Sequence, residues 1–96
     1  MVRQAGLRGP PLSYVVEGGW PDGCVEGPSE VRYAQELSRR LREAIGERSL
    51  REVARAARLD HTTISAVLAG RRWADLVTIS RLETTLGVRL WPDLQE

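Results

Sequence analysis

The sequence has 96 residues, 42% of them hydrophobic, which is enough for one small domain with a well-packed core. With a single histidine and a single cysteine, it excludes a disulfide within the chain and a histidine–cysteine metal site. No apolar run has the length of a membrane-spanning helix, and no signal-peptide pattern opens the chain. We therefore expect a cytoplasmic protein.

The charge of the chain is small but unevenly distributed. All 14 basic residues are arginine, and asparagine and phenylalanine are also missing, which indicates a GC-rich bacterial genome. The net charge of +1 is too weak to indicate a nucleic-acid partner by itself. Residues 29–70, however, carry eight arginines against six acidic residues, whereas residues 1–28 carry two against three. The basic excess therefore lies in the middle of the chain.

The first part of the chain has no helical pattern. Residues 1–13 contain two glycines and two prolines, so they predict a flexible or extended arm. Either this arm is a frayed terminus, or Arg3 and Arg8 enter a DNA minor groove.

Two β-prone runs follow this arm, Tyr14–Val16 and Cys24–Val25, with the turn-forming residues GGWPDG between them. They predict a β-hairpin. Such a hairpin is marginal alone, so it must pack on another surface, and Trp20 is its natural anchor.

Two longer helices are predicted at either side of the centre of the chain. The first has Ser29 as its N-cap and ends at Gly46. The second has Asp75 as its N-cap and ends at Gly87. We expect the buried stripe of this second helix to consist of Leu76, Ile79, Leu82 and Leu86. The residues expected to close the core after the helix are Val88, Leu90 and Trp91.

Two shorter amphipathic helices lie between them and meet at a tight turn. Ser49 caps the first and forms a capping box with Glu52, and Asp60 caps the second. The second helix is expected to bury Ile64, Val67 and Leu68. Its opposite face is small and neutral, and comprises Thr62, Ala66 and Ala69. DNA-reading helices present such a face, because they lie deep in the major groove.

This region resembles the phage-repressor (Cro or xenobiotic-response-element) helix–turn–helix family over about residues 31–92. The residues that carry the resemblance align with the family pattern without a gap. They are Val53-Ala54, Arg58-Leu59, Thr63-Ile64-Ser65 and Gly70. Two positions depart from the family pattern. Arg58 stands where the family usually has glycine, so we expect it to adopt a left-handed conformation. Leu68 replaces a frequent glutamate, so the ion pair that this glutamate often makes is not expected.

The resemblance implies a mainly α fold and a DNA-binding function. Residues 29–96 are expected to form a repressor-like helix–turn–helix domain of four to five helices, and residues 1–28 an arm with a short β-hairpin. The protein is then a sequence-specific transcription regulator that reads the major groove of double-stranded DNA with the helix at about 61–69. A module of this kind usually reads a palindrome as a homodimer, and no cofactor is needed.

The expected DNA contacts fall into two sets. Thr62 and Ala66 point away from the buried stripe, and the resemblance adds His61 and Ser65 as base contacts. The expected phosphate contacts lie on this helix and in the segments that flank it, and are Arg48, Arg51, Thr63, Arg71 and Arg72.

Other functions remain open at this point. Catalysis is not expected, since His61 and Cys24 offer the only nucleophile–base pair of this kind. The serious alternative is an antitoxin-type or adaptor protein of the same fold, which binds a toxin or a regulator through its N-terminal segment. We also predict that residues 12–27 form a hairpin or strand used in self-association. Packing of Trp20 on the protein's own helices is the other possibility.

Overall fold

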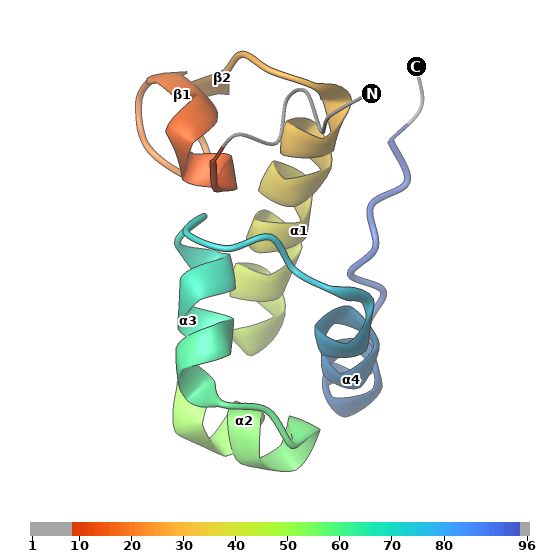
Figure 1. Ribbon diagram of the computed structural model, residues 1–96. Coiled ribbons are helices and arrows are strands. Elements are labelled where there is room, and N and C mark those ends of the chain that lie inside the picture. Colours follow the sequence, from red (N-terminus) through yellow and green to blue (C-terminus); the bar gives the residue numbers. More distant parts are fainter. Residues whose placement is uncertain (1–8, 95–96) are drawn as a thin grey trace, which may run out of the picture.

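A computed structural model of the chain describes residues 9–94 and is mainly helical, as the sequence predicts. The elements in chain order are η1 (Pro11–Tyr14), β1 (Val15–Glu17), β2 (Cys24–Val25), α1 (Ser29–Ile45), α2 (Leu50–Ala57), α3 (His61–Leu68) and α4 (Leu76–Leu86). The strands form the predicted antiparallel hairpin above the helices, and α3 and α4 lie on either side of α1 (Figure 1). None of the described helices is long and apolar enough to cross a membrane. The expectations for Arg3 and Arg8 concern residues outside the described range.

Cap residues fix most helix ends where the sequence predicts them. The Ser49 hydroxyl accepts hydrogen bonds from the amides of Arg51 and Glu52, at 3.1 and 3.3 Å. The Asp75 carboxylate accepts one from the Thr78 amide at 2.8 Å, and this bond lowers the pKa of Asp75. These bonds satisfy amide groups that a helix leaves without partners in its first turn.

The prediction of Ser29 as an N-cap is wrong. Ser29 is already the first residue of α1, and Pro28 occupies the cap position with a φ of −68°. Because the proline ring itself holds φ near this value, the chain enters α1 without a side-chain cap.

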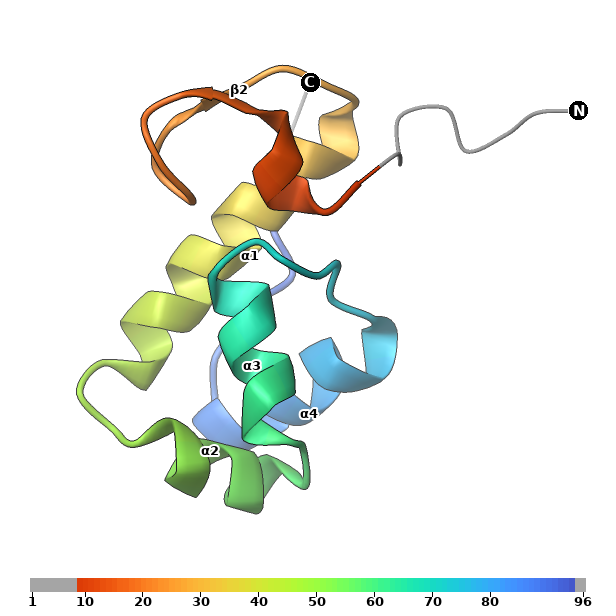
Figure 2. The same ribbon diagram turned by 60° about the vertical axis from the view of Figure 1, so that its left-hand side comes forward.

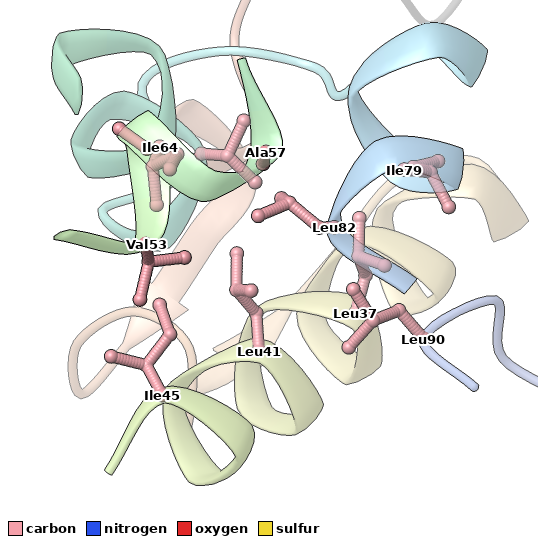
Figure 3. Close-up of a cluster of buried hydrophobic side chains, with 11 residues drawn as sticks. Leu37, Leu41, Ile45, Val53, Ala57, Ile64, Ile79, Leu82 and Leu90 are labelled. Atoms are coloured by element: carbon pink, nitrogen blue, oxygen red, sulfur yellow. The ribbon is translucent and has the colours of Figure 1, made fainter. Parts of the chain in front are cut away.

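All four helices contribute to one core (Figure 3). Its most deeply buried leucine and isoleucine side chains, at most 1% exposed, come from α1, α3, α4 and the tail after α4, and are Leu41, Ile64, Leu82 and Leu90. From α3, Ile64 and Val67 are buried as predicted, whereas Leu68 only packs at the edge of the core. Burial of Ile64 and Val67 therefore sets which face of α3 is turned toward the core.

Two expectations about the end of the chain are wrong. In α4, Leu76 is 75% exposed, because the buried face runs through Thr78, Ile79 and Leu82 and leaves the first residue of the helix outside. In the C-terminal tail (residues 87–94), Leu90 is buried, but Val88 and Trp91 are exposed.

The tail adopts this arrangement because one side chain of α4 holds its backbone. The Glu83 carboxylate accepts hydrogen bonds from the amides of Leu90 and Trp91, at 2.8 and 3.0 Å. These bonds lower the pKa of Glu83 and direct only one of the two neighbouring side chains toward the core.

The N-terminal segment (residues 9–27) is anchored to the helices through Trp20. The Trp20 indole donates a hydrogen bond to the Ser38 hydroxyl at 3.1 Å, and Ser38 donates one to the Val67 carbonyl oxygen at 3.0 Å. The Leu12 amide donates to the Gly70 carbonyl oxygen at 2.7 Å. Trp20 thus packs on the protein's own helices, which is the second of the two possibilities that the sequence offers.

The turn between the strands is held by polar side chains of α1. Buried Gln35 donates hydrogen bonds to the carbonyl oxygens of Pro21 and Gly23, at 2.9 and 2.8 Å. Arg39 and Arg42 each form an ion pair with Asp22 at 3.2 Å, and the hydrogen bonds from Arg42 and Arg39 lower the pKa of this carboxylate. The N-terminal segment is therefore bound to α1 by its turn as well as by its tryptophan.

Gly70 permits the contact between Trp20 and the end of α3. A Cβ atom at this position would lie 2.7 Å from the indole ring, so the ring rests directly on the backbone. Gly70 also has a φ of 76°, which side-chain-bearing residues rarely adopt.

We predict that Gly70→Ala destabilises the fold more than Gly87→Ala. Both glycines have positive φ, 76° and 69°, so alanine incurs a similar backbone cost of about 1–2 kcal/mol at each. At Gly87 nothing lies within 4 Å of the added Cβ, whereas at Gly70 the collision with Trp20 adds about 1–3 kcal/mol. Urea unfolding measures the difference. In a Trp20→Ala background the two alanine variants should become equally stable, and a persisting difference would contradict the contact.

Candidate nucleic-acid interface

The turn between α2 and α3 is built without glycine. Arg58 adopts the left-handed conformation that the sequence predicts, with φ 61° and ψ 45°. The Leu59 amide then donates to the Ala54 carbonyl oxygen at 2.9 Å, which closes the end of α2. Arg81 of α4 donates to the Arg58 carbonyl oxygen at 2.9 Å. Backbone and side-chain hydrogen bonds therefore hold the angle between the two helices.

The first turn of α3 is capped by Asp60. Its carboxylate accepts a hydrogen bond from the Thr62 amide at 3.1 Å, and this bond lowers the pKa of Asp60. The His61 ring lies close by, with its Nδ1 atom 3.7 Å from the same carboxylate oxygen. The backbone of α3 is thus fixed at the end where the predicted base contacts begin.

The four predicted base contacts differ in accessibility. Thr62 is exposed, and the other three, His61, Ser65 and Ala66, are partly exposed. α3 lies in front of α1 and α4 in Figure 2, and η1 lies at its C-terminal end. The N-terminal half of α3 is therefore the part that a large partner reaches most easily.

The predicted phosphate contacts lie just before α2, in its first turn, on α3 and after α3. Arg48 and Arg51 are exposed at the start of α2, and Arg71 and Arg72 are exposed in the α3–α4 loop (residues 69–75). The Arg72 guanidinium donates a hydrogen bond to the Thr63 hydroxyl at 3.3 Å, so the structure brings these two residues together. Positive charge therefore lies in the segments that flank α3 on either side.

Arg55 also belongs to this surface, although it was not among the predicted contacts. Arg55 lies one helical turn after Arg51 and, together with His61, these two arginines line a shallow groove between α2 and α3. Their spacing of four residues on the exposed face of α2 is the signal that could have identified Arg55.

The α3–α4 loop is supported by the N-terminal segment, a contact that the sequence did not predict. The Trp73 indole donates a hydrogen bond to the Gly9 carbonyl oxygen at 3.0 Å. The backbone bond between Leu12 and Gly70 lies at the start of the same loop. The N-terminal segment thus braces the loop that carries Arg71 and Arg72, a contact between distant parts of the chain that no local pattern indicates.

Comparison with known protein families identifies the helix–turn–helix. The profile of a helix–turn–helix family matches residues 39–90, more than half of the chain. The chain belongs to the Cro-type helix–turn–helix family. Membership of this family makes it a DNA-binding transcription regulator.

Among solved structures, this helix–turn–helix protein is similar to the restriction-modification controller protein C.AhdI from Aeromonas hydrophila. The two are 34% identical, the match covers 60% of this chain and 85% of that chain, and the TM-score is 0.47. No curated protein matches the chain.

We predict that Asp60→Asn makes the fold less sensitive to acid. Because the pKa of Asp60 is lowered from its usual 3.8, its charge stabilises the folded state at neutral pH. This stabilisation is lost as the pH falls through the folded-state pKa, whereas asparagine caps α3 without titrating. The free energy of unfolding, compared at neutral pH and in acid, should therefore fall less in the variant than in the wild type. Asp93→Asn, in the exposed tail, is the control, and equal acid sensitivity of the wild type and Asp60→Asn would contradict the role of the cap.

Proposed function

We propose that the protein is a cytoplasmic, sequence-specific regulator that reads the major groove of double-stranded DNA with α3. The observation that carries this proposal is the accessible N-terminal half of α3 with arginines in the segments before and after it. Burial of Ile64 and Val67 turns the outer face of the helix away from the core. A polyanion that approaches this face meets positive charge on both sides.

The two sets of contacts have different roles in this proposal. The arginines before α2 and in the α3–α4 loop bind phosphates, which position the protein but carry no sequence information. His61 and Thr62, at the accessible end of α3, donate or accept hydrogen bonds at base edges. Ser65 adds a further hydroxyl, and the methyl group of Ala66 suits the methyl group of thymine. Because no arginine or glutamine is among these base contacts, phosphate contacts are expected to supply most of the affinity.

We predict that Thr62→Ala and Arg71→Ala weaken DNA binding in two distinguishable ways. Thr62→Ala should lower the affinity for a selected site by about 1–3 kcal/mol and relax the preference at one base pair. Arg71→Ala should weaken binding to all sequences alike and reduce the slope of affinity against salt by about one. Binding titrations at several salt concentrations measure both effects, with Arg89→Ala in the C-terminal tail as the control. A loss at Arg71 that is confined to one sequence would instead show a base contact.

We also propose that two copies form a dimer, so that two α3 helices read one palindrome. The first turn of α4 supports this, because Leu76 and Val77 are adjacent and are 75% and 54% exposed. Exposed neighbouring apolar side chains indicate a surface for association. Leu76 and Val77 directly follow the α3–α4 loop, so a twofold axis at these residues would place the α3 helices of the two copies side by side. Half-sites would then be about 10 base pairs apart, one turn of DNA.

The hairpin remains the other surface for self-association, as the sequence predicts. Val16 of β1 is 57% exposed, but the strands have only three and two residues. Trp20 of this segment donates a hydrogen bond to Ser38 of α1, and Gln35 of α1 donates to the turn, so both residues are engaged within the protein. The same observation weakens the case for a toxin or regulator that binds through this segment.

We predict that Leu76→Glu converts the dimer into a folded monomer, because it places a charge where two apolar surfaces meet. Val16→Glu is the matched control, with an exposed apolar residue replaced in the same way. Mass in solution, measured by light scattering over a range of concentrations, distinguishes the two surfaces. Dissociation caused by Val16→Glu and not by Leu76→Glu would assign the interface to the hairpin.

A further inference from the structure

An aromatic groove lies apart from the residues assigned to DNA. It has a volume of about 140 Å³ and opens between α1, the α3–α4 loop and the C-terminal tail. Three aromatic side chains line it, Tyr33, Trp73 and Trp91, together with Pro92 and the core residue Ile79. None of the predicted base or phosphate contacts lines this groove. The reading of DNA by α3 therefore leaves it without an assigned role.

Hydrogen bonds hold the side chains of Tyr33 and Trp73 and the backbone of Trp91. The Tyr33 hydroxyl donates to the Leu94 carbonyl oxygen at 3.3 Å, and the Trp73 indole donates to Gly9. The backbone of Trp91 is held on both sides, since its amide donates to Glu83 and its carbonyl oxygen accepts from Arg40 at 3.1 Å. The walls of the groove are thus fixed before any ligand arrives, which lowers the cost of binding.

The side chain of Trp91 remains largely in contact with solvent. Trp91 is 52% exposed, and its ring centre lies 6.5 Å from that of Tyr33 with 48° between the ring planes. Tilted rings at this spacing form a favourable aromatic pair. The exposed part of the Trp91 side chain remains accessible to a ligand in the groove.

The charge of the groove favours a cation. Glu30, in the first turn of α1, is the one charged side chain among the described residues that line it. No arginine lines it, although the chain has 14 basic residues, all arginine. Aromatic faces attract cations through their quadrupole, and quaternary ammonium groups are recognised in this way.

We propose that this groove binds a small organic cation of the quaternary ammonium class, with its charge between the aromatic faces and Glu30. The size agrees, since an apolar cavity of about 150 Å³ holds a single benzene ring, whereas drug-sized ligands need about 300 Å³ or more. One trimethylammonium-sized group therefore fills it. This binding does not depend on DNA and is tested on the free protein.

The three tryptophans of the chain provide the readout. Choline is the probe, and its neutral tert-butyl isostere, in which carbon replaces the charged nitrogen, is the matched control. In NMR titrations, the indole N–H signals of Trp73 and Trp91 should shift with choline, while that of Trp20, which is bound to Ser38 outside the groove, should not. The isostere should bind at least about fivefold more weakly, as expected for the loss of cation–π attraction.

Two variants test the residues themselves. Trp91→Ala and Glu30→Gln should each weaken choline binding by about two- to fivefold, whereas Glu47→Gln, at an exposed position after α1, should not change it. Equal binding of choline and its isostere would overturn the proposal, as would unchanged affinity in both variants. No shift at Trp73 and Trp91, or an equal shift at Trp20, would overturn it as well.

Discussion

The burial of Ile64 and Val67 determines how α3 is rotated, and the candidate functions of this protein depend on that rotation. Both side chains are at most 3% exposed. A helix of eight residues is marginal alone, so its orientation comes from tertiary contacts and not from its own propensity. Once the inner stripe is fixed, Thr62 is left on the outside, together with part of Ser65 and Ala66. The same packing thus stabilises the domain and presents the surface assigned to DNA.

Both ends of α3 have a separate means of support. Asp60 caps the first turn, and the left-handed Arg58 sets the angle at which the chain enters the helix. At the other end, the contact between Trp20 and Gly70 and the hydrogen bond from Ser38 to Val67 join the helix to the N-terminal segment. This segment therefore acts as a support for α3, which the family resemblance alone did not reveal.

The features that the sequence predicted correctly are those determined by nearby residues. The ends of α2 and the left-handed Arg58 follow from caps and from a turn that must be made within a few positions. The error in the C-terminal tail has a non-local cause. The exposure of Trp91 depends on Glu83, eight positions away in the sequence. Periodicity also misplaced Leu76, since a helix can extend beyond the surface that its buried face covers.

The α3–α4 loop connects the two surfaces for which functions are proposed. Arg71 and Arg72 lie on its side toward α3, and Trp73 forms one wall of the aromatic groove. The loop is held by Gly9 and Leu12 of the N-terminal segment. A support of this kind keeps the arginines and the tryptophan in defined places, although the loop itself contains no regular secondary structure.

If the outer face of α3 reads a base sequence, its side chains decide which DNA the protein selects. The most direct test is to select DNA from a random pool with the wild-type protein and with a folded variant in which His61, Thr62 and Ser65 are all alanine. The wild type should enrich one sequence with twofold symmetry, and the variant should enrich a different or more degenerate one while retaining its salt-dependent binding. Enrichment of the same sequence by both proteins would contradict this role of α3.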